Sequence, residues 1–458
     1  MNVNKFSRLP LVVISFLIAL TGCGDSADTK IQGQPIGMFD SGTGGLTVME
    51  AFLNLDSFNN VTGEEVPDGI PDFAGEDFIY LADQANMPYG VYSSAGKTDY
   101  LKELIIKDAE FLNREPNNAK LIVIACNTAT AYGLDDVKKY LTEDGKGITV
   151  IGVIESGAGA ALKVVPKEEA VFGVGVLATI GTIASEGYEN TLRRMALDQG
   201  YTGDMRVVNQ GGLGFAESVD MEIDYVSASA DKIRPNYRGP IYGDVDTGIV
   251  PELLPVYNFD RSGNALLAEV DRHGRVSDMQ LNSAGNYARF HMVSLVEKHR
   301  RDNPDVKLKS IIMGCTHYPY FTDTLSKVVT ELKAYTVNGE SIYASLFDEN
   351  LVFIDPGMDV AKESFRRLYA DKWLNSRKEG RENTLKGFIT VPADGLNPEF
   401  LDENGNLTYE HKYGREVGEG SSSVKIVPFS KDNINSDNMT RIESRLPATY
   451  SLIQNSLK

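Results

Sequence analysis

The chain has 458 residues, of which 42% are hydrophobic and 24% charged, and its formal net charge is −19. This length allows two or three domains with a large core, and the composition is ordinary for a soluble globular protein. The strong negative charge argues against nucleic acid as a partner, because no basic surface is available to displace counterions from phosphates.

The N-terminal segment predicts export. Two basic residues precede a mostly apolar run from Leu9 to Leu20, which is too short for a comfortable transmembrane helix. The run ends in Leu-Thr-Gly-Cys, which resembles a bacterial lipoprotein signal with Cys23 as the lipidated residue. An ordinary signal peptide with an incidental cysteine is the alternative, and the position of the cysteine favours the lipoprotein. We therefore expect a signal peptide over residues 1–22, a tether over residues 23–34, and a lipid-anchored protein in the bacterial cell envelope, periplasmic or associated with the outer membrane.

Short apolar runs alternate with helical patterns along the chain, which predicts an α/β fold with mainly parallel sheets. Helical spacing of apolar residues is clearest over 101–112 and 134–141. The apolar runs expected to form strands lie at residues 36–39, 78–81, 121–124, 149–154, 174–177, 310–313 and 351–354.

Polar residues that directly follow these runs are candidates for a site, because ligands of such sheets bind beyond the carboxyl ends of the strands. For two of them, Asp83 and Glu155, capping of the next helix is an equally good explanation. The candidates are Asp40, Asp83, Cys126, Glu155 and Cys315.

Two regions interrupt the alternation. Residues 219–285 carry Pro, Gly and Asp with hairpin-like turns, which is typical of an insertion, and residues 376–458 form a polar C-terminal extension. We expect a first α/β domain from residues 35–150 and 345–375, and a second α/β domain from residues 151–344.

Two cysteines, Cys126 and Cys315, lie in the body of the chain, and each ends an apolar run. A thiol at the start of a helix is stabilised as the thiolate by unpaired backbone amides, and such a group acts as a nucleophile or a general base. Two equivalent thiols suit a reaction in which one removes a proton and the other returns one to the opposite face. A disulfide is the alternative in an oxidising compartment. The small polar residues that follow each cysteine favour a pocket, and these are Asn127, Thr128, Thr316 and His317.

Several motifs, in order along the chain, resemble those of the glutamate racemases of the aspartate/glutamate racemase family. The likeness covers most of residues 35–215 and 290–370. It implies a cofactor-independent racemase fold in which two α/β domains face each other. The motifs are Phe39-Asp40-Ser41-Gly42-Thr43-Gly44-Gly45-Leu46-Thr47, Met87-Pro88-Tyr89-Gly90, Ala125-Cys126-Asn127-Thr128-Ala129 and Gly314-Cys315-Thr316-His317-Tyr318-Pro319.

The resemblance also implies a role for each motif. Cys126 would exchange the α-proton of the D-enantiomer and Cys315 that of the L-enantiomer. Asp40 and His317 would support the thiols and the substrate ammonium. Neither a metal nor a cofactor is implied. The residues that would hold the substrate carboxylates are Ser41, Tyr89, Gly90, Asn127, Thr128 and Thr316.

We therefore expect racemisation of L-glutamate to D-glutamate by a two-thiol, two-base mechanism. The resemblance implies D-glutamate for the peptidoglycan of the cell wall, which is made from a cytoplasmic pool, whereas the export signal places this chain outside that pool. Two alternatives stay open. One is a racemase or isomerase of the same superfamily that acts on aspartate or a related acid, and the other is a lipid-anchored acidic amino-acid-binding protein without catalysis. The expected partners are a small-molecule amino acid and, through Cys23, a membrane, with no nucleic acid. A homodimer is left open.

Overall fold

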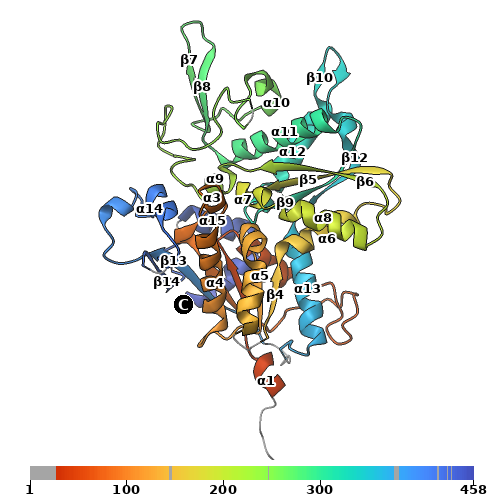
Figure 1. The fold of residues 1–458 in the computed structure, drawn as a ribbon, viewed down its shortest axis with the longest axis vertical. Coiled ribbons are helices and arrows are strands. Elements are labelled where there is room, and N and C mark those ends of the chain that lie inside the picture. Colours follow the sequence, from red (N-terminus) through yellow and green to blue (C-terminus); the bar gives the residue numbers. More distant parts are fainter. Residues whose placement is uncertain are drawn as a thin grey trace, which may run out of the picture.

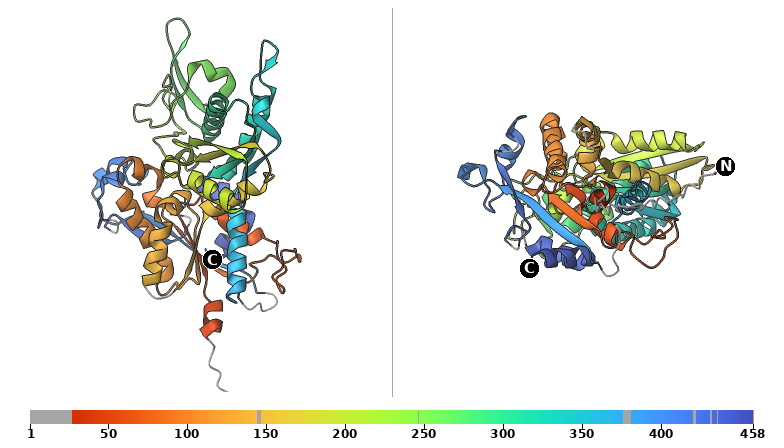
Figure 2. Two further views of the ribbon diagram at one scale, coloured as in Figure 1. Left: turned by 45° about the vertical axis from the view of Figure 1, so that its right-hand side comes forward. Right: turned by 90° about the horizontal axis from the view of Figure 1, so that it is seen from below.

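The computed structural model describes residues 27–143, 147–245, 247–375, 381–419, 422–430, 432–434 and 436–457. Two α/β units are stacked along the long axis of the molecule (Figure 1), and a turned view separates them clearly (Figure 2). The expected signal peptide and Cys23 lie outside the described residues. Within the described ranges, the helices are too short or too polar to cross a membrane.

The first unit is built on a six-stranded sheet in the order β14-β13-β2-β1-β3-β4, parallel except for the antiparallel pair β13–β14. Ile36 pairs with Phe78 on one side and with Leu121 on the other, so the central strands end at one edge. The strands are β1 (Ile36–Asp40), β2 (Asp77–Ala82), β3 (Leu121–Ile124), β4 (Thr149–Gly152), β13 (Thr384–Pro392) and β14 (Val424–Pro428).

Helices cover both faces of this sheet because its buried side chains alternate between two cores. Phe39 and Leu81 pack with α4 (Thr98–Asn113) and α5 (Asn127–Glu143). Met38 and Tyr80 belong to the opposite core. That core includes side chains of α2 (Leu46–Asn54), α13 (Pro356–Ala370) and α16 (Pro447–Ser456).

The second unit is built on a four-stranded parallel sheet in the order β12-β9-β5-β6. The strands are β5 (Val171–Ala178), β6 (Asp204–Gly211), β9 (Leu308–Gly314) and β12 (Phe347–Ile354). Its helices are α6 (Val153–Lys163), α7 (Ile180–Ala184), α8 (Gly187–Asp198), α9 (Phe215–Val219), α11 (Ala284–Asp302) and α12 (Thr322–Ala334).

The expected insertion projects from the second unit, where its hairpin lies at the top of Figure 1. It contains α10 (Leu254–Tyr257) and the antiparallel pair β7 (Leu266–Val270) and β8 (Val276–Leu281), which confirms the hairpin-like turn before Gly274. A second small hairpin, β10 (Thr336–Val337) and β11 (Glu340–Ser341), follows α12. The remaining helices are α1 (Ala27–Gln32), α3 (Gly90–Ser94), α14 (Tyr409–Gly414) and α15 (Ser436–Arg445).

The structure places three segments differently from the sequence expectation. The apolar run that ends at Ile354 was expected in the first domain, but β12 pairs with β9 in the second sheet. The C-terminal extension does not stand apart, because β13 pairs with β2 and completes the first sheet. Helix α1 occupies part of the expected tether. An apolar run predicts a strand but not its partner, which explains the first two differences.

A buried ion pair lies at the amino ends of β2 and β3 in the first sheet. Lys120 precedes β3 and Glu76 precedes β2, and their side chains are 0% and 2% exposed with Nζ 2.6 Å from Oε2. Lys120 also donates to the carbonyl of Gln32 at 2.9 Å, and the backbone N–H of Asn375 donates to Glu76 Oε1 at 2.6 Å. The pair therefore connects two strands with the segments before β1 and after α13.

Candidate active site

The carboxyl ends of the two sheets face each other across a small cavity of about 20 Å³. All ten residues that the sequence assigned to catalysis or substrate binding line this cavity, together with Met87, Pro88, Thr179 and Ala216. Such a cavity has room for about one water molecule. An amino acid therefore fits only when the two units move apart, and the structure shows the closed arrangement.

Cys126 lies between β3 and α5, on the side of the first unit. Its sulfur accepts a hydrogen bond from the backbone N–H of Ala129 at 3.4 Å and donates to Ser41 Oγ at 3.8 Å. Burial raises the pKa of the Cys126 thiol, Asp40 raises it further, and the Ala129 amide and Ser41 lower it by less. The sequence expectation of a stabilised thiolate is therefore wrong for Cys126 in the closed cavity, because removal from water penalises the charged form more than the helix amides favour it.

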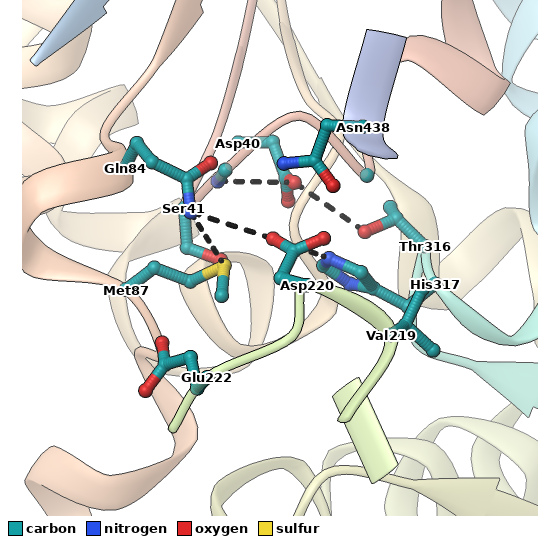
Figure 3. Close-up of polar contacts among 12 residues, drawn as sticks. Asp40, Ser41, Gln84, Met87, Val219, Asp220, Glu222, Thr316, His317 and Asn438 are labelled. Carbon is teal, nitrogen blue, oxygen red and sulfur yellow. Dashed lines mark hydrogen bonds and ion pairs between the residues drawn. The ribbon is translucent and has the colours of Figure 1, made fainter. Parts of the chain in front are cut away.

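Cys315 follows β9, on the side of the second unit, and begins a chain of polar contacts. Its sulfur lies 3.6 Å from His317 Nδ1, and His317 Nε2 lies 3.3 Å from Asp220 Oδ2 (Figure 3). Burial alone would lower the pKa of His317, but Asp220 and Cys315 together raise it well above its ordinary value. Asp220 and Cys315 thus favour the protonated form of His317, whose ring lies beside the Cys315 sulfur.

Asp40 connects the two units from the end of β1. Its Oδ2 accepts hydrogen bonds from the backbone of Gly45 at 2.9 Å and Gly42 at 3.3 Å, and from Thr316 Oγ1 of the second unit at 3.4 Å. Burial raises the pKa of Asp40, which His317 and the two amides oppose. Asp40 Oδ1 is buried and has no hydrogen-bond partner among the described residues. One carboxylate oxygen thus remains available to a donor on a ligand.

The glycine-rich turn after Asp40 permits close approach of the two units. A β-carbon added to Gly44 would lie 2.6 Å from His317 Cε1 and 2.7 Å from Thr316 Oγ1. Real β-carbons do not come so close to other atoms, so a larger residue at Gly44 would displace His317. The absence of a side chain at Gly44 therefore allows His317 to occupy its position at the cavity.

The polar residues after Cys126 also contact the second unit. Thr128 Oγ1 lies 2.8 Å from Thr179 Oγ1 and 3.1 Å from Thr182 Oγ1, and Tyr188 donates to Asn127 Oδ1 at 2.6 Å. These contacts link the start of α5 to α7 and α8. Asn127 and Thr128 thus connect the two units in the closed arrangement, and they also line the cavity.

Tyr89 is placed at the cavity, but its hydroxyl is already engaged within the first unit. The hydroxyl lies 2.5 Å from Asp83 Oδ2 and 2.8 Å from Asp108 Oδ2, and burial raises the pKa of both carboxyl groups. A phenol has one proton to donate, so the two carboxyl groups compete for the Tyr89 hydroxyl. The side chain of Asp83 makes no cap hydrogen bond to the helix that follows it and does not line the cavity. The Tyr89 hydroxyl is unavailable to a substrate carboxylate in this arrangement.

Sequence reasoning included two candidates that do not line the cavity, Asp83 and Glu155, and missed two residues beside it. Glu155 is exposed and pairs with Arg194 at 2.9 Å, away from the cavity. Asp220, one residue beyond α9, was assigned to the insertion, and Arg441 on α15 was assigned to the extension; their side chains lie 2.7 Å apart. A carboxylate directly after the apolar residues of α9 was a signal for Asp220, whereas nothing in the local sequence distinguished Arg441.

The disulfide alternative does not hold in this structure. Cys126 and Cys315 are both buried and free. Each sulfur instead has a polar partner suited to proton transfer, Ser41 for the first and His317 for the second. Two thiols from two different sheets therefore border one cavity.

Comparison with known proteins agrees with this arrangement. No family model matches the chain. The chain is 38% identical to a glutamate racemase of Levilactobacillus brevis over 376 residues, which are 81% of this chain and 93% of that protein. It is 36% identical to a glutamate racemase of Oceanobacillus iheyensis over 296 residues, which are 65% of this chain and 72% of that protein.

Solved structures that resemble the chain include those of glutamate racemases. Isoform RacE1 from Bacillus anthracis is 20% identical, with a TM-score of 0.45 over 78% of this chain and 89% of that one. The Francisella tularensis enzyme in complex with D-glutamate is 20% identical, with a TM-score of 0.44 over 84% and 95% of the two chains. The sequence identity to these two relatives, over 93% and 72% of their lengths, shows that the chain belongs to the glutamate racemase family.

Proposed function

We propose that the protein interconverts L- and D-glutamate with two opposed thiols. The observation that carries this proposal is the placement of Cys126 and Cys315, from different sheets, on one cavity. The Cys315 sulfur lies 3.6 Å from His317 Nδ1, whereas burial favours Cys126 as a protonated thiol. We therefore assign proton removal from the L-enantiomer to Cys315 and proton donation to Cys126.

The reaction then requires the removal of one proton from one face of the α-carbon and the addition of one proton to the opposite face. The Cys315 thiolate removes the α-proton of L-glutamate, and the Cys126 thiol donates its proton to the opposite face of the carbanion. The product is D-glutamate, with Cys315 now a thiol and Cys126 a thiolate, and the reverse reaction starts from that state. Fixed hydrogen-bond donors around the cavity would stabilise charge on the substrate carboxylate as the carbanion forms.

The substrate ammonium also has a partner in this scheme. Asp40 Oδ1 is buried without a hydrogen-bond partner among the described residues. An ammonium group beside Asp40 would neutralise a carboxylate that raises the pKa of Cys126. Substrate binding would therefore lower the energy of the Cys126 thiolate at the stage when that thiolate forms.

Racemisation in deuterated water tests the proposed function. We expect purified protein under reducing conditions to convert either enantiomer of glutamate to an equal mixture, measured by circular dichroism, with deuterium entering at the α-carbon by mass spectrometry. Aspartate, one methylene shorter, should react at least about 10-fold more slowly. A preference for aspartate would favour the alternative substrate, and an absence of exchange with both acids would favour a binding protein.

We also propose that Cys23 carries a lipid and that the mature protein is an envelope lipoprotein. The support is the Leu-Thr-Gly-Cys sequence after a short apolar run. In a bacterial host, the full chain should enter the membrane fraction with a lipid mass on an N-terminal Cys23, whereas Cys23→Ala should keep its signal segment uncleaved. An unmodified Cys23 in the mature protein would contradict this. Association of two copies into a homodimer likewise stays a proposal.

A further inference from the structure

A helix of the C-terminal extension reaches the catalytic contacts of the second unit. Arg441 on α15 places Nη2 2.7 Å from Asp220 Oδ1, and its Nη1 donates to the carbonyl of Val219. The side chain of Asp220 is 1% exposed and that of Arg441 is 15% exposed. The guanidinium therefore partners a carboxylate that solvent does not reach.

The same guanidinium also contacts the segment that carries His317. It lies 5.0 Å from the ring centroid of Tyr320, three residues after His317. Asn438, one turn earlier on α15, accepts a hydrogen bond from Nη2 at 2.7 Å and so orients the group. Arg441 thus contacts Asp220 directly and also contacts the segment that follows His317.

The mechanism proposed above requires a Cys315 thiolate, and the charges of this cluster then balance only when Arg441 is present. Arg441 and a protonated His317 are cations, and Asp220 and the Cys315 thiolate are anions, so the four groups sum to zero. Without Arg441 the remaining three carry one net negative charge, and neutrality returns when Cys315 takes up a proton. A buried cluster far from neutrality is costly in a medium of low dielectric constant.

Other ionisable groups near Asp220 do not change the difference in net charge between the native cluster and a cluster without Arg441. The same groups are present in both proteins, so the two clusters differ by one positive charge. These groups are Asp40, Tyr80, Glu222 and Tyr320.

We propose that Arg441 is a positioning residue for catalysis: it holds Asp220 ionised and directed at His317, and so keeps Cys315 in the thiolate form. The C-terminal extension is then part of the catalytic apparatus. The inference rests on the proposed roles of Cys315 and His317, and its test does not depend on any substrate.

Alkylation of Cys315 by iodoacetamide, followed by peptide mass spectrometry across a pH series, measures the thiolate directly. We expect Arg441→Gln to move the midpoint of Cys315 alkylation to higher pH by about one unit, the size expected for loss of a nearby opposite charge. The acidic limb of the racemisation pH profile should move in the same direction. Arg441→Lys, which keeps the charge, should restore most of both shifts.

A matched control lies one turn further along α15. Arg445 is 53% exposed and pairs with the exposed Asp323 at 3.5 Å, so Arg445→Gln should leave both midpoints unchanged.

If Arg441→Gln does not fold, Asn438→Ala provides the test of the inference. This variant removes the acceptor that orients the guanidinium, so it should shift the Cys315 midpoint by less and in the same direction. An unshifted Cys315 midpoint in the folded variant overturns the inference, even if racemisation falls. A shifted midpoint in a protein that does not racemise glutamate supports the inference and contradicts the proposed function.

Discussion

Replacing either thiol should lower glutamate racemisation by at least about 10³-fold, because each removes the acid or base on one face of the α-carbon. The variants are Cys126→Ala and Cys315→Ala, and the rate is followed by circular dichroism from each enantiomer.

The two variants should differ in the proton exchange that remains. In deuterated water, Cys126→Ala keeps the Cys315 base, so the α-proton of L-glutamate exchanges without inversion. Cys315→Ala should show the mirror-image behaviour with D-glutamate. Arg445→Gln, remote from both sulfurs, provides a variant that should retain the native rate. Racemisation that survives removal of either sulfur would rule out the two-base mechanism.

Lys120→Met should lower the free energy of unfolding by about 3–5 kcal/mol at pH 7, because it leaves the Glu76 carboxylate buried without its cation. Burial already raises the pKa of Glu76, and Lys120 is the main group that opposes this. Loss of Lys120 raises that pKa further, so folded Glu76 binds a proton more tightly than unfolded Glu76. The variant is then relatively more stable below the ordinary pKa of Glu, and loses stability as the pH rises through the folded pKa.

Urea unfolding of the native chain and the variant at pH 5 and pH 7 measures this difference. The deficit of Lys120→Met should be smaller at pH 5, and adding Glu76→Gln should recover part of it at pH 7. Lys139→Met is the matched surface change, since Lys139 is 75% exposed and 4.0 Å from Glu143, and it should alter stability by less than about 0.5 kcal/mol. Equal deficits at both pH values would show that the charge of Glu76 is not the cause.

Much of the fold was predictable because its central strands are buried on both faces. The runs that become β1, β3 and β9 are almost continuous hydrophobic sequence, which is typical of parallel sheets covered by helices. Strand β6 was missed because only three of its eight residues are buried and polar residues interrupt its apolar pattern. The pairing of β12 with β9 could not be predicted, since pairing is a tertiary property.

The site was predictable where chemistry is concentrated in short motifs. Asp40 and Cys126 lie at the ends of strands of the first sheet, and Cys315 and His317 follow a strand of the second sheet. They share a cavity because the carboxyl ends of the two sheets face each other. The sequence could not show the direction of the Cys126 pKa, because desolvation depends on how completely the other unit closes over the thiol. The sequence also could not place Arg441. This residue follows Cys315 by 126 positions and contacts the site only through the packing of α15.

The late strand β13 has a consequence for the order in which the two units fold. The second sheet draws all its strands from residues 171–354, so it becomes complete while a growing or translocating chain is still unfinished. The first sheet begins with β1 but leaves the outer edge of β2 open until residues 384–392 arrive. An open apolar edge is a template for pairing with other chains. During synthesis the first unit is therefore the aggregation-prone part, and it is protected only when the C-terminal segment docks.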